Sequence, residues 1–104
     1  MPIGVSESSL VWQASRDVAA LIDPDGGIVI DLTGGRCHSL NGIGAFLWSR
    51  LSAAGGATMD EMVSAVQAAA ADTPPSVQRD IDTFLAAMAA RGLIESIALE
   101  DRHF

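Results

Sequence analysis

The stretch from residue 18 to residue 41, VAALIDPDGGIVIDLTGGRCHSLN, decides the fold of this chain. It contains three runs with strand-like composition, at residues 18–23, 27–32 and 36–41. Pro24–Gly27 separates the first two runs and Thr33–Gly35 separates the last two. Proline presets φ for a tight turn, and glycine supplies a positive φ. Two short turns between three strands predict an antiparallel meander.

Three amphipathic helical segments are expected after the strands. Asn41 is a suitable N-cap for the first segment. Thr58 and Glu61 match a capping box at the start of the second. The third is expected to hold Pro74 or Pro75 in its first turn and to end before Gly92.

These elements predict an α+β fold, because the helices must cover the apolar face of a small sheet. The expected arrangement is winged helix-turn-helix-like, with a three-stranded antiparallel sheet followed by three helices. The length of 104 residues suits one domain. We expect an N-terminal arm at residues 1–17, in which Leu10–Ala14 is a short strand or an extended arm. The domain itself is expected at residues 18–95 and a C-terminal tail at 96–104.

The charge balance makes nucleic acids and anionic membranes unexpected as partners. The chain has a net charge of −7, with six arginines and no lysine. Nucleic-acid binding and binding to anionic membranes both depend on basic residues, so neither is expected. No apolar run is long enough to span a bilayer, and residues 1–9 lack the features of a signal peptide. The expected location is therefore the cytoplasm.

The sequence offers no convincing catalytic, metal or cofactor site. Cys37 and His38 are neighbours, but neighbouring side chains of a strand point to opposite faces and could not share a proton. A single cysteine excludes an intrachain disulfide and a CxxC site. Asp80 and Asp82 lie two residues apart on a helix and do not face each other. We therefore expect a protein that is not an enzyme and that has no catalytic residues, metal ligands or cofactor.

The strand at residues 36–40 is a candidate binding edge. It contains neither proline nor lysine, the residues that commonly block the free edge of a sheet. Such an edge can accept an extended peptide as an added strand. Two alternatives remain open at this point: Leu10–Ala14 covers the edge, or the edge has no function.

Four segments resemble the PqqD-like family, whose members are recognition elements for ribosomally made, post-translationally modified peptides. The segments are GGIVIDLTGGR (26–36), SLNGIGAFLW (39–48), TMDEMV (58–63) and RGLI (91–94), the last preceded in the third helix by RDI (79–81), Phe84, Leu85 and Met88. The resemblance extends over about residues 18–95 and is greatest to the stand-alone lasso-peptide version. In the family, an aromatic residue often follows the Gly-Arg pair, whereas this chain has Cys37 and His38 there.

The resemblance implies non-catalytic binding of a precursor's leader peptide as an added β-strand, between the third strand and the third helix. The bound leader would be presented to a leader peptidase of the cysteine protease class and to a cyclase. The implied peptide-binding residues are Arg36, Cys37, His38, Ser39, Asp80, Thr83, Phe84 and Ala87. Core packing is an equal alternative role for Phe84. The functional alternatives are a PqqD-type chaperone for a radical-SAM peptide-modifying enzyme and a winged-helix transcription regulator.

Overall fold

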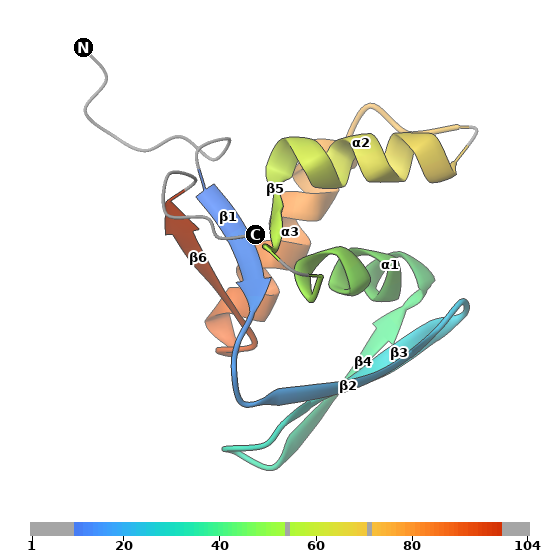
Figure 1. Cartoon of the computed structure of the whole chain (residues 1–104). Coiled ribbons are helices and arrows are strands. Elements are labelled where there is room, and N and C mark those ends of the chain that lie inside the picture. The colour runs from blue at the N-terminus through green and yellow to red at the C-terminus, as the bar shows by residue number, and fades with distance from the viewer. Residues whose placement is uncertain (1–9, 54, 71, 99–104) are drawn as a thin grey trace.

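The computed structural model describes residues 10–53, 55–70 and 72–98 (Figure 1). The elements in this part of the chain follow in the order β1 (Leu10–Ala14), β2 (Val18–Asp23), β3 (Gly26–Asp31), β4 (Arg36–Asn41), α1 (Gly42–Leu51), β5 (Ala57–Thr58), α2 (Met59–Ala69), α3 (Val77–Ala90) and β6 (Ile94–Ala98). The fold class is α+β, as the sequence predicts. Residues 1–9 of the expected arm and 99–104 of the expected tail lie outside the described residues.

The predicted meander is present as the antiparallel sheet β2–β3–β4. Its two turns are fixed in the same way, because an aspartate at the start of each accepts hydrogen bonds from two backbone amides that follow it. Asp23 does so at 2.8 and 3.1 Å, and Asp31 at 3.0 and 3.1 Å. The middle strand begins at Gly26 and ends at Asp31, one residue earlier at each end than the sequence predicts.

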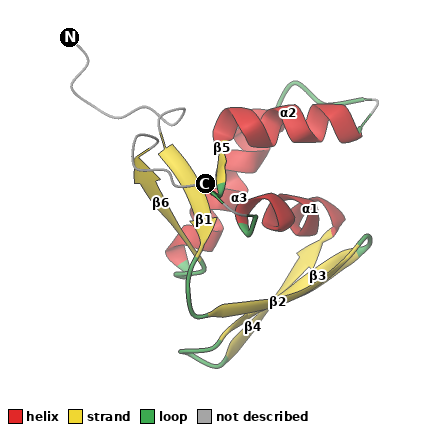
Figure 2. Ribbon diagram, in the orientation of Figure 1, coloured by secondary structure: helices red, strands yellow, loops and turns green. Residues whose placement is uncertain are grey.

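The expectation of a single sheet followed by helices is wrong, because a second antiparallel sheet has the order β5–β1–β6. In it Leu10 lies opposite Ala98, and Val11 lies opposite Thr58. Residues 96–98, expected in the tail, are therefore part of a strand. Figure 2 shows the strands as two separate groups. This sheet joins segments that are distant in sequence, which local patterns do not reveal.

The predicted helix ends are largely confirmed. The side chain of Asn41 accepts a hydrogen bond from the amide of Gly44 at 2.8 Å and so caps α1. The capping box of α2 is complete: Thr58 Oγ1 accepts from the amide of Glu61 at 3.1 Å, and the Glu61 carboxylate accepts from the amide of Thr58 at 2.9 Å. Gly92, directly after the last turn of α3, has φ +72°.

The start of α3 differs from the prediction, because Pro74 and Pro75 precede the helix rather than lie in its first turn. The helix begins at Val77, with Ser76 as its N-cap residue. The carbonyl of Pro74 accepts a hydrogen bond from the amide of Val77 at 3.1 Å. Since a residue before proline is disfavoured in the helical region, Pro74 cannot readily belong to the helix. The prolines form the turn that leads into it.

The core lies between the meander, α1, α2 and α3. Helix α1 packs against β3 and β4, and α3 packs against α2 and β6. The largest fully buried side chains are Leu47, Leu51, Met59, Met62, Ile81, Leu85, Leu93, Val11 and Val29. Each full burial of an aliphatic side chain of this size contributes roughly 1.5–3 kcal/mol. None of the helices in the described ranges has the length and hydropathy that crossing a bilayer requires.

Candidate peptide-binding site

Strand β4 lies at an edge of its sheet. It pairs with β3 on one side, and no strand of the described ranges pairs with its other side. Strand β1 pairs with β5 and β6 instead. The alternative that Leu10–Ala14 covers this edge is therefore wrong. The free edge leaves alternate backbone N–H and C=O groups of β4 pointing outward.

The side chains of β4 alternate between two faces. His38 lies opposite Val29, which is completely buried, and Leu40 is buried as well. This face of the sheet is the one that α1 covers. Cys37 and Ser39 are exposed and belong to the opposite face. A peptide bound beside β4 would therefore meet His38 and Leu40 on the helix side.

Strand β4, helix α1 and helix α3 converge at Gly44. A Cβ atom built on Gly44 would lie 3.3 Å from Phe84 Cε1, 3.3 Å from Asn41 Oδ1 and 3.4 Å from Leu40 Cβ. A larger side chain at this position would push the ring of Phe84 away. The absence of a side chain lets α3 approach the start of α1 closely, and it places the half-buried Phe84 next to the end of β4.

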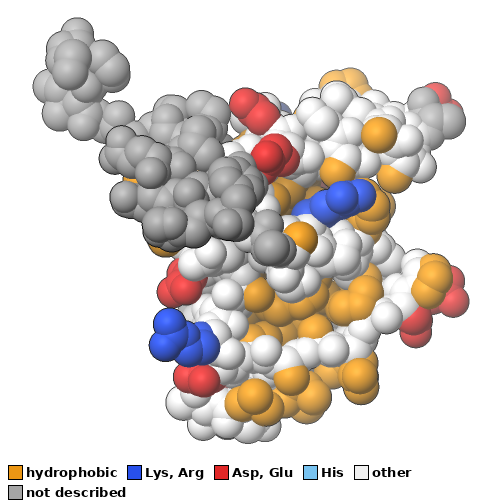
Figure 3. Space-filling model, viewed as in Figure 1, with side chains coloured by type: hydrophobic (Ala, Val, Ile, Leu, Met, Phe, Trp, Pro, Cys, Tyr) orange, Lys and Arg blue, Asp and Glu red, His pale blue; other side chains and the backbone are white. Residues whose placement is uncertain are grey.

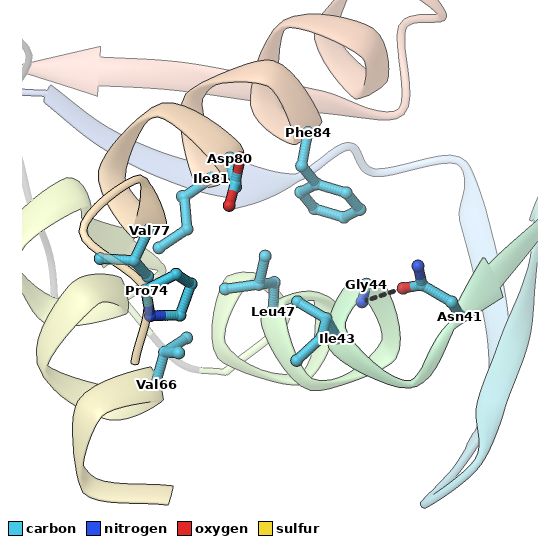
Figure 4. Close-up of a pocket in the computed structure, with 10 residues that line it drawn as sticks. All are labelled: Asn41, Ile43, Gly44, Leu47, Val66, Pro74, Val77, Asp80, Ile81 and Phe84. Carbon is cyan, nitrogen blue, oxygen red and sulfur yellow. Dashed lines mark hydrogen bonds between the residues drawn. The ribbon is translucent and has the colours of Figure 1, made fainter. Parts of the chain in front are cut away.

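A cavity of about 330 Å³ opens at this junction (Figure 4). Its lining consists of Asn41, Ile43, Gly44, Leu47, Val66, Pro74, Val77, Asp80, Ile81 and Phe84. Most of these residues are apolar, and Asp80 is the charged residue among them. Figure 4 shows the Phe84 ring at the end nearest Gly44 and Asn41, with Val66, Pro74 and Val77 at the other end. An apolar cavity with one acidic group suits a bulky apolar side chain and a nearby hydrogen-bond donor.

The polar groups on α3 differ in what they can still bind. The hydroxyl of Thr83 donates to the carbonyl of Arg79 at 3.0 Å. Asp80 accepts one hydrogen bond, from the hydroxyl of Ser76 at 3.1 Å, and forms no ion pair with any described residue. The exposed carboxylate of Asp80 therefore keeps acceptor capacity for a ligand.

The structure brings together only part of the residue set implied by the family resemblance. Asp80 and Phe84 line the cavity. The strand segment 36–39 lies along the β4 edge and contributes nothing to the cavity lining, and the same is true of Thr83 and Ala87 on α3. Ala87 is half-buried against the core, as is Phe84.

Sequence reasoning missed most of the cavity. The missed lining residues are Asn41, Ile43, Gly44, Leu47, Val66, Pro74, Val77 and Ile81. Helical spacing places Ile43 in the same apolar stripe as Leu47, yet Ile43 is 58% exposed and Leu47 is 1% exposed. Spacing alone does not distinguish the two. Across the described residues, no group of three or more His, Cys, Asp or Glu residues could hold a metal ion.

An antiparallel meander with an open edge and an apolar cavity against the third helix is an arrangement that suits an α+β domain that binds peptides by strand addition. The family model for coenzyme PQQ synthesis protein D (PqqD) matches residues 19–94 of this chain. The chain belongs to the PqqD family. Domains of this family are non-catalytic, which confirms that the chain is not an enzyme. The domain boundaries at residues 18 and 95 stay a prediction.

A solved structure of TbiB1 in complex with the TbiA(beta) leader peptide is similar to this chain. The TM-score is 0.71 and the sequence identity is 30%. The similarity covers 83% of this chain and 98% of TbiB1. A comparison with curated proteins gave no match.

Proposed function

We propose that the chain binds the leader region of a ribosomally synthesised precursor peptide as an added strand on β4. The open edge of β4 beside an apolar cavity carries this proposal. TbiB1, which has the same fold at 30% identity, forms a complex with a leader peptide. Main-chain hydrogen bonds to β4 would supply sequence-independent affinity, and the cavity would select the leader's side chains.

The alternation of side chains along β4 supports a set of contacts for the leader. An added strand alternates its side chains, as β4 does. Those on the helix side would lie against His38 and against Phe84 and Ala87 of α3. Beyond Asn41, the strand would reach the cavity, where a bulky apolar side chain fits. Asp80 would accept a hydrogen bond from a basic or hydroxyl group of the leader.

We further propose that the product class is a lasso peptide and that the protein acts in the cytoplasm. In this role the bound leader is presented to a cysteine protease and a cyclase.

The PqqD name of the matching family supports one alternative, a chaperone for a radical-SAM peptide-modifying enzyme. The exposed Asp80 and Asp82 on α3 oppose the transcription-regulator alternative, because DNA phosphates repel carboxylates. A cyclase gene next to the gene for this chain supports the lasso role, and a radical-enzyme gene there supports the alternative.

Amide hydrogen exchange with and without leader tests the added strand directly. The probes are the leader of the precursor encoded beside the gene for this chain and the TbiA(beta) leader. Alternate amides of β4 already bond to β3, so only the outward-pointing ones should gain protection when leader binds. Protection gained along β2 instead of β4, or along neither strand, would refute binding at this edge.

A matched pair of proline variants separates the two sides of β4. Because neighbouring amides point in opposite directions, one of His38 and Ser39 donates toward β3 and the other points outward. Proline removes the donor in each case. One of His38→Pro and Ser39→Pro should lower the free energy of unfolding. The other should abolish leader binding while the domain stays folded. Full leader affinity in both variants would contradict the added-strand proposal.

A further inference from the structure

The meander has a second open edge, formed by β2. Strand β2 pairs with β3 on one side, and no strand in the described ranges pairs with its other side. Residues 18–22 are all apolar, without the lysine, proline or inward-pointing charge that normally protects an edge strand from pairing. An apolar edge with no such protection is a site for strand addition or a liability for aggregation.

A groove runs along this edge between β2 and α1. Val18, Ala20 and Ile22 form one wall, since they lie on the same face of the sheet as Val29 and Leu40. The other wall is formed by Ala45, Phe46, Trp48 and Ser49 of α1 and by the C-cap residue Ser52. Two adjoining hollows of about 470 and 370 Å³ share Ile22 and Ser49 and together span the length of β2.

Figure 3 looks onto this side of the molecule and shows apolar side chains gathered between α1 and the lower sheet. Ile22 is 39% exposed there. The inward side chains of a strand added to β2 would fall into this groove. The arrangement parallels the opposite edge, where Phe84 of α3 lies near Leu40 at the end of β4, but it uses a different helix as its second wall.

The groove is acidic at the end next to the β2–β3 turn. Asp23 lines the hollow at that end, and Asp25 is exposed in the turn. One oxygen of Asp23 accepts the two turn amides at 2.8 and 3.1 Å, and its other oxygen has no bond to any described residue. This end of the groove is therefore suited to a cationic group.

The charges oppose a second copy of this chain as the occupant. A two-fold axis perpendicular to the sheet and centred on the middle of β2 would place either Ala20 or Leu21 opposite itself. In the first register Asp17, in the turn before β2, would come near Asp23 of the other copy, and in the second it would come near Asp25 in the turn after β2. Like charges brought this close at the two ends of the paired strands would be destabilising. The net charge of −7 adds long-range repulsion between copies.

We propose that β2 and α1 form a second docking site, which takes an extended segment of another protein with alternating apolar residues and a basic residue at one end. The site is separate from the leader site and does not depend on it. With both edges occupied, the sheet would have five strands and would hold the leader and the partner segment at its opposite edges.

The test is an NMR titration of the ¹⁵N-labelled chain with a short synthetic peptide that alternates valine and threonine and carries lysine at both ends. Saturable shift changes are expected in β2 and along α1. They are expected to persist, with unchanged affinity, when the TbiA(beta) leader is present in excess. A matching peptide with glutamate at both ends should bind more weakly, and the difference should shrink at high salt.

Two neighbouring residues provide matched variants. Ile22→Glu places a charge in the apolar groove and should weaken peptide binding about tenfold or more. Leu21→Glu is the control, because Leu21 is 72% exposed and lies on the opposite face of the sheet. Ser49→Trp fills the groove from an exposed position on α1 and should also weaken binding. The NMR spectrum of each variant without peptide shows whether the variant is folded. If either Ile22→Glu or Ser49→Trp is not folded, the remaining one of the two is used for the test.

Several results would overturn the proposal. These are shift changes confined to β4 and α3, displacement of the peptide by the leader, absence of binding, or equal weakening by Leu21→Glu. A dimer that Ile22→Glu disrupts would show that a second copy is the occupant. Failure of the leader to bind β4 would refute the proposed function alone, because the synthetic peptide reports on β2 independently.

Discussion

Replacing Phe84 by alanine separates its two possible roles, because stability and leader affinity are expected to change by different amounts. Truncating a fully buried phenylalanine costs about 3–5 kcal/mol. Phe84 is mostly but not fully buried, so a cost near the lower end of this range, about 3 kcal/mol, is expected for the free energy of unfolding. If the ring is also a wall of the leader site, Phe84→Ala must weaken leader binding as well.

The loss of affinity follows from the part of the ring that stays accessible. A phenylalanine has roughly 150–250 Å² of surface, and a ring that keeps about a quarter of it accessible offers roughly 50 Å² for a leader side chain to cover. At about 25 cal/mol per Å² this contact is worth about 1 kcal/mol, which corresponds to a five- to tenfold increase in Kd. Urea denaturation gives the stability, and isothermal titration with the leader gives Kd, both at a temperature where the variant is folded.

Leu85→Val is the matched control for this experiment. Leu85 is 1% exposed, follows Phe84 on the same helix and does not line the cavity. The substitution should lower stability by about 1 kcal/mol and leave Kd unchanged. If Phe84→Ala also lowers stability but keeps Kd within twofold of the parent, Phe84 is a core residue only, and the assignment of α3 as the second wall is refuted.

Three further predictions test single contacts. Thr58→Ala removes one half of the capping box and should lower the free energy of unfolding by about 1 kcal/mol in a urea titration, whereas an unchanged midpoint would mean that the Glu61 half suffices. Gly92→Ala forces a residue with a Cβ to φ +72° and should lower Tm, which calorimetry measures, by about 4–8 °C for a cost of about 1 kcal/mol. Asp80→Asn should reduce the affinity for a leader with a basic residue by about two- to fivefold at low salt, and a loss of equal size in high salt would show that charge is not the cause.

Local sequence signals predicted the local structure well. The caps at Asn41 and Thr58 and the glycine at position 92 were found because each depends on residues within one helical turn. The β5–β1–β6 sheet was missed because its pairs join residues near opposite ends of the described chain, and β5 has only two residues. No periodicity is visible in so short a strand.

The same distinction holds for the candidate site: its edge strand could be predicted from the sequence, and its cavity could not. The third strand of a meander is an edge unless another element joins it, so the β4 edge followed from the order of the strands. The cavity depends on how closely α3 approaches α1 at Gly44, a distance that follows from three-dimensional packing. A glycine within a helical apolar pattern is a signal for such a close approach, although it does not identify the partner.

The pairing of β1 with β6 determines how the domain responds to force. Leu10 and Ala98 lie opposite each other, so the described chain enters and leaves the sheet at the same end of this strand pair. A pulling force applied through the flanking segments would act perpendicular to the two strands. It would separate the opposed residue pairs one after another, from Leu10–Ala98 toward Ala14–Ile94. Pulling on both flanking segments therefore places the force on the β5–β1–β6 sheet first. Strands β2 and β4 belong to the other sheet and would carry little of this load at the start.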